Sequence, residues 1–334
     1  MIGLSSVWSE LRGWFSGDST GAYVCQRLGL AVLQIVILLV LLFVLVVLLP
    51  GDTADVLGNE VLGAQQMQHQ REAMGLNRPP VQRFAIWLCG LVHGELGRSL
   101  AGDQPVAQLI AGPFAVTGLL AACAVLILVP VTWLAGFASG LHPGSPLDRL
   151  ITAISIVLDS VPDFVLALLL VAWLSLSWGL FPATLMGVDL ATMLRHPGFM
   201  VLPLIVMVAR VSAPLIRQVR AGVINVMAEP YVTQARRLGM PRWRLLTRYV
   251  APNALAPAMQ ELGRTSDGLL SGVLIVEAIF VVPGVASTLI NAISTRDEPV
   301  VLGVMLITGT LAILVNVGID VLGRIMVPRS VRTA

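Results

Sequence analysis

Residues 28–49 of this chain read LGLAVLQIVILLVLLFVLVVLL and decide its fold class. The run contains one polar side chain, Gln34, and it is long enough to span a bilayer, whose hydrocarbon core takes about 20 apolar residues of helix. A cleavable signal peptide is the alternative interpretation, but its apolar core is shorter and does not follow 27 other residues. The run therefore predicts a transmembrane helix.

Five further apolar stretches follow, and the last three contain polar side chains, as helices facing a bundle interior do. They cover about residues 114–139, 150–175, 200–217, 263–282 and 300–323. We therefore expect an all-α membrane protein with six transmembrane helices in residues 28–323. The remaining parts are an N-terminal extension (1–27), a long outer loop (50–113) and a short tail (324–334).

The composition excludes several classes of protein. Of the 334 residues, 12% are charged, against about 25% in an ordinary soluble domain. All 21 basic residues are arginine, so the chain has no lysine for a phosphate-binding P-loop or a Schiff base, and any ATP must bind to another subunit. The net charge of +2 predicts no nucleic-acid partner. The three cysteines lack the spacing of a zinc site, so we expect no metal.

Six spans place both termini on one side of the membrane, and the arginines indicate which side. Thirteen arginines flank the spans on the side of the N-terminus and six on the opposite side. Four of those six lie in the long outer loop, where charge has less influence on topology. Because cytoplasmic loops carry the excess of basic residues, we expect both termini in the cytoplasm.

Two helices are also expected in the outer loop. The polar residues 65–75 predict a helix that stops at Gly75, and Phe84, Trp87 and Leu91 predict an amphipathic helix after it. This second helix either packs on the outer mouth of the bundle or docks an external protein.

Residues 229–252 form the most informative loop. Glu229 and Pro230 indicate a helix start, because an acid is favoured in the first turn and proline needs no hydrogen bond there. Tyr231, Ala235 and Leu238 are spaced to share one helix face. Gly239 is a typical left-handed stop.

A second short helix begins after Pro241, with Trp243, Leu246 and Val250 on one face, and Pro252 closes the segment. The two helices form either a rigid knob that fits a partner's cleft or interfacial helices held to anionic lipid by their arginines. The residues alone leave both interpretations open.

The spacing Ala235-x-x-x-Gly239, followed after twelve residues by Pro252, resembles the EAA loop of ABC-importer permeases, E-A-A-x-x-x-G-x9-I-x-L-P. Four positions depart from that loop: Thr233, Gln234, Tyr249 and Ala251. Further motifs over residues 27–332 resemble the dipeptide/oligopeptide/nickel branch of these permeases. They include Gly94-Glu95-Leu96-Gly97-Arg98-Ser99, Asp148-Arg149, Ser160-Val161-Pro162-Asp163-Phe164, Glu277-x-x-Phe280-x-x-Pro283-Gly284 and Arg296-Asp297-x-Pro299. Val282 and Ala286 depart from the branch, which usually has tryptophan and glycine there.

This resemblance implies a bacterial inner-membrane subunit that forms half of the path for peptides, nickel or metal chelates. It also implies a second, homologous permease, two ATP-binding subunits and an extracytoplasmic substrate-binding protein. ATP and Mg would bind to the ATPases, and this chain would hold no cofactor and catalyse no reaction. The residues expected to contact the ATPase are Glu229, Tyr231, Ala235, Arg236, Gly239, Arg242 and Pro252.

Five polar side chains lie in or near the predicted spans: Asp159, Asp163, Glu277, Asn316 and Asp320. A carboxylate in the middle of a membrane costs about 2.5–3.5 kcal/mol or more, so each must face a cavity or have a partner. They are candidates for a polar translocation path. The alternative is a helix contact or a position near the membrane surface, which we favour for Asp159 and Asp320 and leave open for Asp163 and Glu277.

Two other functions compete with an ATP-driven importer. An ion-coupled secondary transporter would use Asp159 and Asp163, but it leaves the two cytoplasmic helices unexplained. An intramembrane protease would need a base for Ser139, and the chain has no histidine after His196 and hence none in the last three spans.

Overall fold

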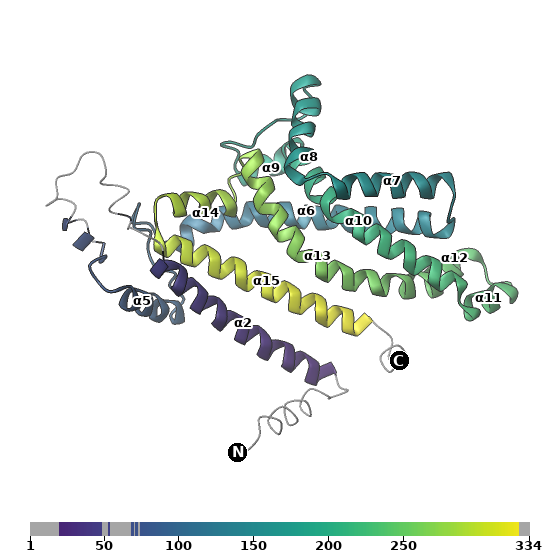
Figure 1. Cartoon of the computed structure of the whole chain (residues 1–334), viewed down its shortest axis with the longest axis horizontal. Coiled ribbons are helices and arrows are strands. Elements are labelled where there is room, and N and C mark those ends of the chain that lie inside the picture. Colours follow the sequence, from purple (N-terminus) through teal and green to yellow (C-terminus); the bar gives the residue numbers. More distant parts are fainter. Residues whose placement is uncertain (1–19, 49–52, 54–67, 70, 73, 327–334) are drawn as a thin grey trace, which may run out of the picture.

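The computed structural model describes residues 20–48, 53, 68, 69, 71, 72 and 74–326, and the regular elements in these ranges are helices (Figure 1). Four helices are long and apolar enough to cross a membrane, and the number rises to six if each of two bent helix pairs is one span. The four are α2 (Thr20–Leu48), α6 (Val106–Leu141), α10 (Gly198–Ala228) and α15 (Glu298–Met326). The all-α membrane fold is thereby confirmed.

The expected N-terminal extension and C-terminal tail fall mostly outside the described residues, which begin at 20 and end at 326. The predicted polar helix at 65–75 lies partly outside them, and Gly75 has the left-handed φ of 69° expected at its stop. The amphipathic helix predicted within residues 50–113 is confirmed as α5 (Pro80–Val92), in which Trp87 is buried.

The first bent pair interrupts the predicted span 150–175. Helix α7 (Pro146–Ser160) and helix α8 (Asp163–Leu170), which continues in the π-helical turn η1 (Val171–Ser177), meet at 106°. Proline has no N–H to donate and disfavours a helical residue before it, and Val161 before Pro162 is extended, with φ −87° and ψ 124°. The proline therefore divides a stretch whose apolar composition alone predicted one straight helix.

The second bent pair follows the loop 229–252. Helix α13 (Ala251–Phe280) begins well before the predicted span 263–282, and its end makes an angle of 76° with α14 (Val285–Ser294). Val281 at the bend adopts a left-handed conformation with φ 52°. A β-branched residue such as valine is uncommon in the left-handed region. This conformation ends α13 before Pro283 could enter the helix.

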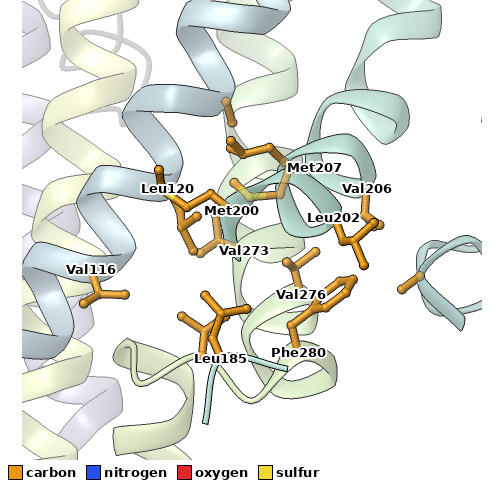
Figure 2. Packing of buried hydrophobic residues seen from close by; sticks show 14 of the residues in the cluster. Val116, Leu120, Leu185, Met200, Leu202, Val206, Met207, Val273, Val276 and Phe280 are labelled. Carbon is orange, nitrogen blue, oxygen red and sulfur yellow. The ribbon is translucent and has the colours of Figure 1, made fainter. Parts of the chain in front are cut away.

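Helix α10 lies at the centre of the bundle and packs most extensively against α6 and α13, while α2 lies beside α15 (Figure 1). The largest apolar cluster sits between these central helices. Figure 2 shows side chains of this cluster from three helices, among them Leu120 of α6, Met207 of α10 and Val276 and Phe280 of α13. Burial of these side chains fixes the separation of the helices.

Small residues allow α10 to approach its neighbours closely. Gly136 and Gly140 lie one turn apart on α6, and a Cβ atom at Gly140 would stand 2.7 Å from the Cβ of Val223. On the other side of α10, a Cβ at Gly222 would overlap the carbonyl oxygen of Ala254 in α13. Glycine at these positions provides the close backbone contact on which membrane helices rely.

The ends of the bundle are clearly distinct. The start of α2 and the end of α15 lie toward the same end as α11 (Pro230–Arg237) and α12 (Arg242–Leu245), whereas α5 and α14 lie at the opposite end (Figure 1). An ion pair of 2.8 Å between Arg27 and Asp320 joins α2 to α15.

We predict that Gly222→Ala destabilises the protein by about 1–3 kcal/mol, because the added methyl group must push a backbone carbonyl away. The melting temperature of the purified chain in detergent measures this effect. Gly118→Ala in α6 is the matched control, since a Cβ there meets no atom within 4 Å. Equal melting temperatures for the two variants would contradict the close contact of α10 with α13.

Candidate functional site

The loop 229–252 begins as the sequence predicts. Glu229 occupies the position before α11 with extended backbone, and Pro230 is the first helical residue. Gly239 has a left-handed φ of 75°. The amide of Met240 donates to the carbonyl of Ala235 at 3.2 Å, which satisfies one of the last carbonyls of the helix. The predicted start and stop of the first helix are thus confirmed.

The three residues expected to share one face of α11, Tyr231, Ala235 and Leu238, are divided between its buried and its exposed side. Val232 and Ala235 are buried against Leu245 of α12, whereas Tyr231 is 42% exposed and Leu238 is 79% exposed. In so short a helix the contact with α12 selects which face is buried, and α12 contacts the face that carries Val232. Leu238 lies beyond the last helical residue, where helical spacing no longer places its side chain.

The second predicted helix does not end at Pro252. Helix α12 continues through the π-helical turn η2 (Leu246–Val250) directly into α13. Pro252 lies in the first turn of α13, where its missing N–H costs little. The residues from Arg242 to Phe280 therefore form one continuous helical path from the loop into the bundle.

Apolar and cationic side chains gather at the tip of this loop. Leu238, Trp243 and Tyr231 are exposed, and the guanidinium of Arg244 lies 5.3 Å from the centre of the Trp243 ring. Exposed Arg236 and Arg242 border a hollow of about 440 Å³ beside this tip. Aromatic side chains with arginines are the residues that dominate protein–protein contacts.

A buried ion pair that the sequence did not single out joins three helices. The carboxylate of Asp148, at the start of α7, accepts hydrogen bonds from Arg220 Nε at 2.7 Å and Nη2 at 2.9 Å. It also accepts from the Ser139 hydroxyl of α6 and from the Gly144 amide at 2.8 Å. Because all these donors surround one carboxylate, the Asp148–Arg220 ion pair holds the turn between α6 and α7 against α10.

Two further aspartates pair with arginines of α10 at the bend between α7 and α8. Asp159 accepts from Arg217 Nη1 at 3.0 Å, and Asp163 pairs with Arg210. The sequence pointed to both aspartates but not to their partners, because Arg217 was counted as a topology marker and Arg210 lies inside a predicted span. An arginine inside one apolar span, together with an aspartate inside a neighbouring span, is the sequence signal that could have identified these pairs.

Glu277 lies elsewhere and is completely buried. Its carboxylate accepts from the Thr117 hydroxyl of α6 and from the Ala286 amide at 2.7 Å, and a Cβ atom at Gly284 would overlap it. The amides at the start of a helix lack partners within the helix, so Glu277 holds the start of α14 against α13. This contact explains the spacing of Glu277 and Gly284.

The other two candidates lie on α15, away from the aspartates at the bend. Asp320 pairs with Arg27 of α2, and Asn316 is half-buried. Because α15 packs chiefly against α2 and α13, the structure does not bring these residues together with Asp159 or Asp163.

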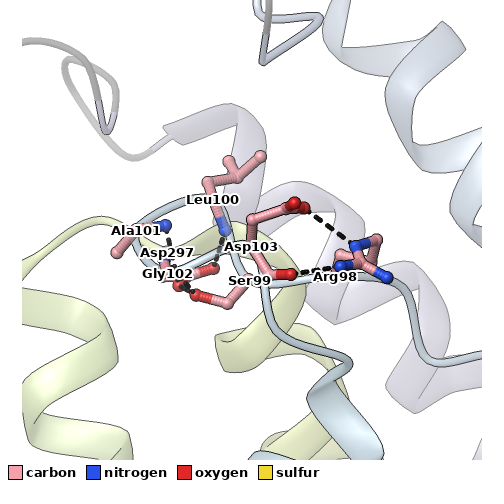
Figure 3. Close-up of polar contacts among 7 residues, drawn as sticks. All are labelled: Arg98, Ser99, Leu100, Ala101, Gly102, Asp103 and Asp297. Carbon is pink, nitrogen blue, oxygen red and sulfur yellow. Dashed lines mark hydrogen bonds and ion pairs between the residues drawn. The ribbon is translucent and has the colours of Figure 1, made fainter.

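At the opposite end, two sequence motifs that are far apart in the chain meet at Asp297 (Figure 3). Its carboxylate accepts from the Ser99 hydroxyl and from the amides of Leu100 at 3.1 Å and Ala101 at 3.4 Å. Asp297 thereby fixes the loop before α6 to the start of α15. The neighbouring exposed Arg98 forms an ion pair with Asp103 that holds the pKa of that carboxyl below its usual value.

We predict that Asp148→Asn lowers the stability of the protein by about 1.5–3 kcal/mol, because charge-assisted hydrogen bonds are lost and Arg220 keeps no buried counter-charge. Thermal unfolding in detergent checks this value. Asp103→Asn removes an exposed pair and serves as the control, with little change expected. A control variant as unstable as Asp148→Asn would show that burial is not what makes the pair important.

Comparison with known families places this arrangement among transport proteins. Residues 129–332 match the family described as the binding-protein-dependent transport system inner membrane component, and residues 22–121 match the family of its N-terminal part. Together these matches cover most of the described helices.

Individual relatives are similar along nearly their whole length. A putative peptide transport system permease protein of Brucella abortus strain 2308 is 32% identical over 308 residues, covering 92% of this chain and 98% of the relative. The dipeptide transport system permease protein of Escherichia coli K12 is 28% identical over 332 residues with the same coverage. A putative peptide permease protein of Brucella suis biovar 1 is 31% identical over 317 residues, again with the same coverage.

Proposed function

The chain belongs to the family of inner membrane components of binding-protein-dependent transport systems, and we propose that it forms half of a translocation path for peptides. Members of this family are multi-pass permeases of ABC importers. They have no ATPase activity of their own and hold no cofactor. What remains to be assigned is therefore the cargo, the partner contacts and the orientation.

The names of the relatives support a peptide as cargo. The three relatives described above are named as permeases for peptides or a dipeptide. Nickel and metal chelates receive no comparable support, and within the described ranges no three His, Cys, Asp or Glu side chains come together as a metal site would need. We therefore place peptides first among the cargoes.

The coupling of transport to ATP is carried by one observation, the continuous helical path from Arg242 to Phe280. A rigid element of this kind can transmit a displacement of the loop 229–252 to the bend held by Glu277. We infer that two ATPase subunits, which bind ATP and Mg, act on this loop and on its counterpart in a second, homologous permease. Both termini then lie in the cytoplasm, at the end of the bundle that carries α11 and α12.

The opposite end faces the substrate-binding protein in this proposal. Helix α5 and the loop fixed by Asp297 form much of that end, and a hollow of about 290 Å³ lies between α5 and the start of α15. Asp159 and Asp163 line the path, because their side chains stand at the bend between α7 and α8. The positions of Glu277, Asn316 and Asp320 favour helix contacts, so they are left out of the proposed path.

Reconstitution tests this function against an ion-coupled transporter. The chain is placed in vesicles with its partner permease, ATPases and binding protein, and uptake of a labelled dipeptide is measured. We expect uptake only when ATP is supplied on the side of the vesicle membrane where the ATPases bind. Uptake driven by a proton or sodium gradient without ATPases would overturn the proposal in favour of a secondary transporter.

We predict that the double substitution Leu238→Ala and Trp243→Ala weakens the association of the ATPase subunits by about tenfold or more, because exposed apolar anchors dominate such contacts. Titration of the purified ATPases onto the permease pair in detergent measures this change. Met186→Ala is the matched control, since Met186 is also 79% exposed but lies outside the loop 229–252. Unchanged association would indicate instead that the tip rests on lipid.

A further inference from the structure

An apolar groove of about 510 Å³ runs between α6, α7 and α10. Its lining is aliphatic except for two serines, Ser155 and Ser212. Each serine hydroxyl donates a hydrogen bond to a carbonyl of its own helix, Ser155 to Ile151 at 2.8 Å and Ser212 to Ala209 at 2.9 Å. The side chains of the groove therefore offer a ligand no free hydrogen-bond donor, which favours an occupant without polar groups.

Contacts outside the groove fix the positions of its three helices. Helix α7 is joined to α10 near both of its ends, by the Asp148–Arg220 and Asp159–Arg217 ion pairs. The α7 residues that line the groove, within 151–158, lie between these two ion pairs. The glycines described above hold α6 close to α10. Because the groove cannot close without breaking these contacts, and an empty groove loses van der Waals contacts, another molecule is needed to fill it.

The charges on α10 indicate which way the groove faces. Arg210 and Arg217 are seven residues apart, close to two helical turns, so both lie on one face of α10. Arg210 is near the middle of this helix of 31 residues, and its side chain is 40% exposed. A half-exposed charge in the middle of a membrane is costly in hydrocarbon and faces water or protein. The arginine face of α10 is therefore turned toward an aqueous path or another subunit.

The groove lies on the opposite face of α10. At 3.6 residues per turn, the α10 residues that line it point roughly 150° away from the two arginines. These residues are Val201, Leu204, Ile205, Val208, Ala209, Ser212 and Ile216. On α6 and α7, the lining residues Ile127, Val131 and Ile154 are exposed. A groove turned away from the arginine face, with exposed aliphatic side chains, opens onto the hydrocarbon of the bilayer.

The size of the groove distinguishes a lipid chain from a helix. Its lining follows α10 from Val201 to Ile216, about 22 Å at a rise of 1.5 Å per residue. A volume of 510 Å³ over that length gives a mean cross-section of about 23 Å². A helix with its side chains is 10–12 Å wide and takes roughly 80–110 Å². A hydrocarbon chain, whose carbons pack 3.5–4.0 Å from their neighbours, takes roughly 16–20 Å² and fits.

We propose that this groove binds an acyl chain of a membrane phospholipid. The chain fills the space between α7 and the closely packed α6 and α10, and the headgroup stays at the membrane surface. The bound lipid thereby supports α7 between its two ion pairs, directly before the break at Pro162. This site goes beyond the transport function proposed above, because it concerns a lipid that stays bound to the permease.

Native mass spectrometry of the complete transporter, purified in mild detergent, counts the phospholipids that remain bound. We expect Ala135→Trp, which places an indole in the groove, to retain fewer phospholipids than the wild type. Leu134→Trp is the matched control, because Leu134 adjoins Ala135 on α6 and is 72% exposed but does not line the groove. We expect it to retain the wild-type number. An unchanged number for Ala135→Trp, or an equal loss in both variants, would overturn the site.

A cross-linking measurement identifies the occupant without filling the groove. Ile154→Cys, in a chain whose Cys25, Cys89 and Cys123 are replaced, is coupled to a benzophenone maleimide. The assembled transporter is then returned to vesicles of phosphatidylglycerol and phosphatidylethanolamine and illuminated. We expect a product heavier by the mass of one phospholipid. A product with the second permease, or with another segment of this chain, would overturn the site. Neither measurement depends on uptake of a peptide, so failure of the proposed cargo leaves both outcomes unchanged.

Discussion

The arrangement of this bundle depends on the pairing of charges that apolar surroundings cannot solvate. A charged side chain within hydrocarbon is costly unless a counter-charge meets it. Helix α10 carries three such arginines, and each meets an aspartate in the segment from α7 to the start of α8. The pairs are Arg220–Asp148, Arg217–Asp159 and Arg210–Asp163. Through these pairs α10 fixes both where the α6–α7 turn lies and which way the chain leaves the proline break.

The same helix also connects the two ends of the bundle. On one side glycines of α6 let α10 approach closely, and on the other Gly222 lies against α13. Helix α13 is itself continuous with the loop 229–252, and its far end is held to α14 by Glu277. A displacement at the exposed tip of that loop therefore reaches the bend and the face of α10 through packed, rigid elements.

Local signals in the sequence predicted local features well. Apolar length predicted the membrane class, and Glu229, Pro230 and Gly239 predicted both ends of α11, because caps and left-handed turns depend on nearby residues. Features that depend on partners were missed. The buried face of α11 depends on its contact with α12, and the role of Arg210 depends on an aspartate 47 residues earlier in the chain. The break at Pro162 was also missed, because the apolar run 150–175 predicted one span, and the angle of 106° depends on helices packed against both sides of the break.

The central claim is that the face of α10 with its half-exposed arginines looks onto an aqueous path in the assembled transporter. Substitution of single cysteines, after replacement of Cys25, Cys89 and Cys123, measures this directly through reaction with a charged, membrane-impermeant thiol reagent. We predict rapid labelling of Arg217→Cys and slow labelling of Leu134→Cys, since Leu134 is 72% exposed on the apolar helix α6 and we expect it to face lipid. Slow labelling at position 217 with rapid labelling at position 134 would contradict it.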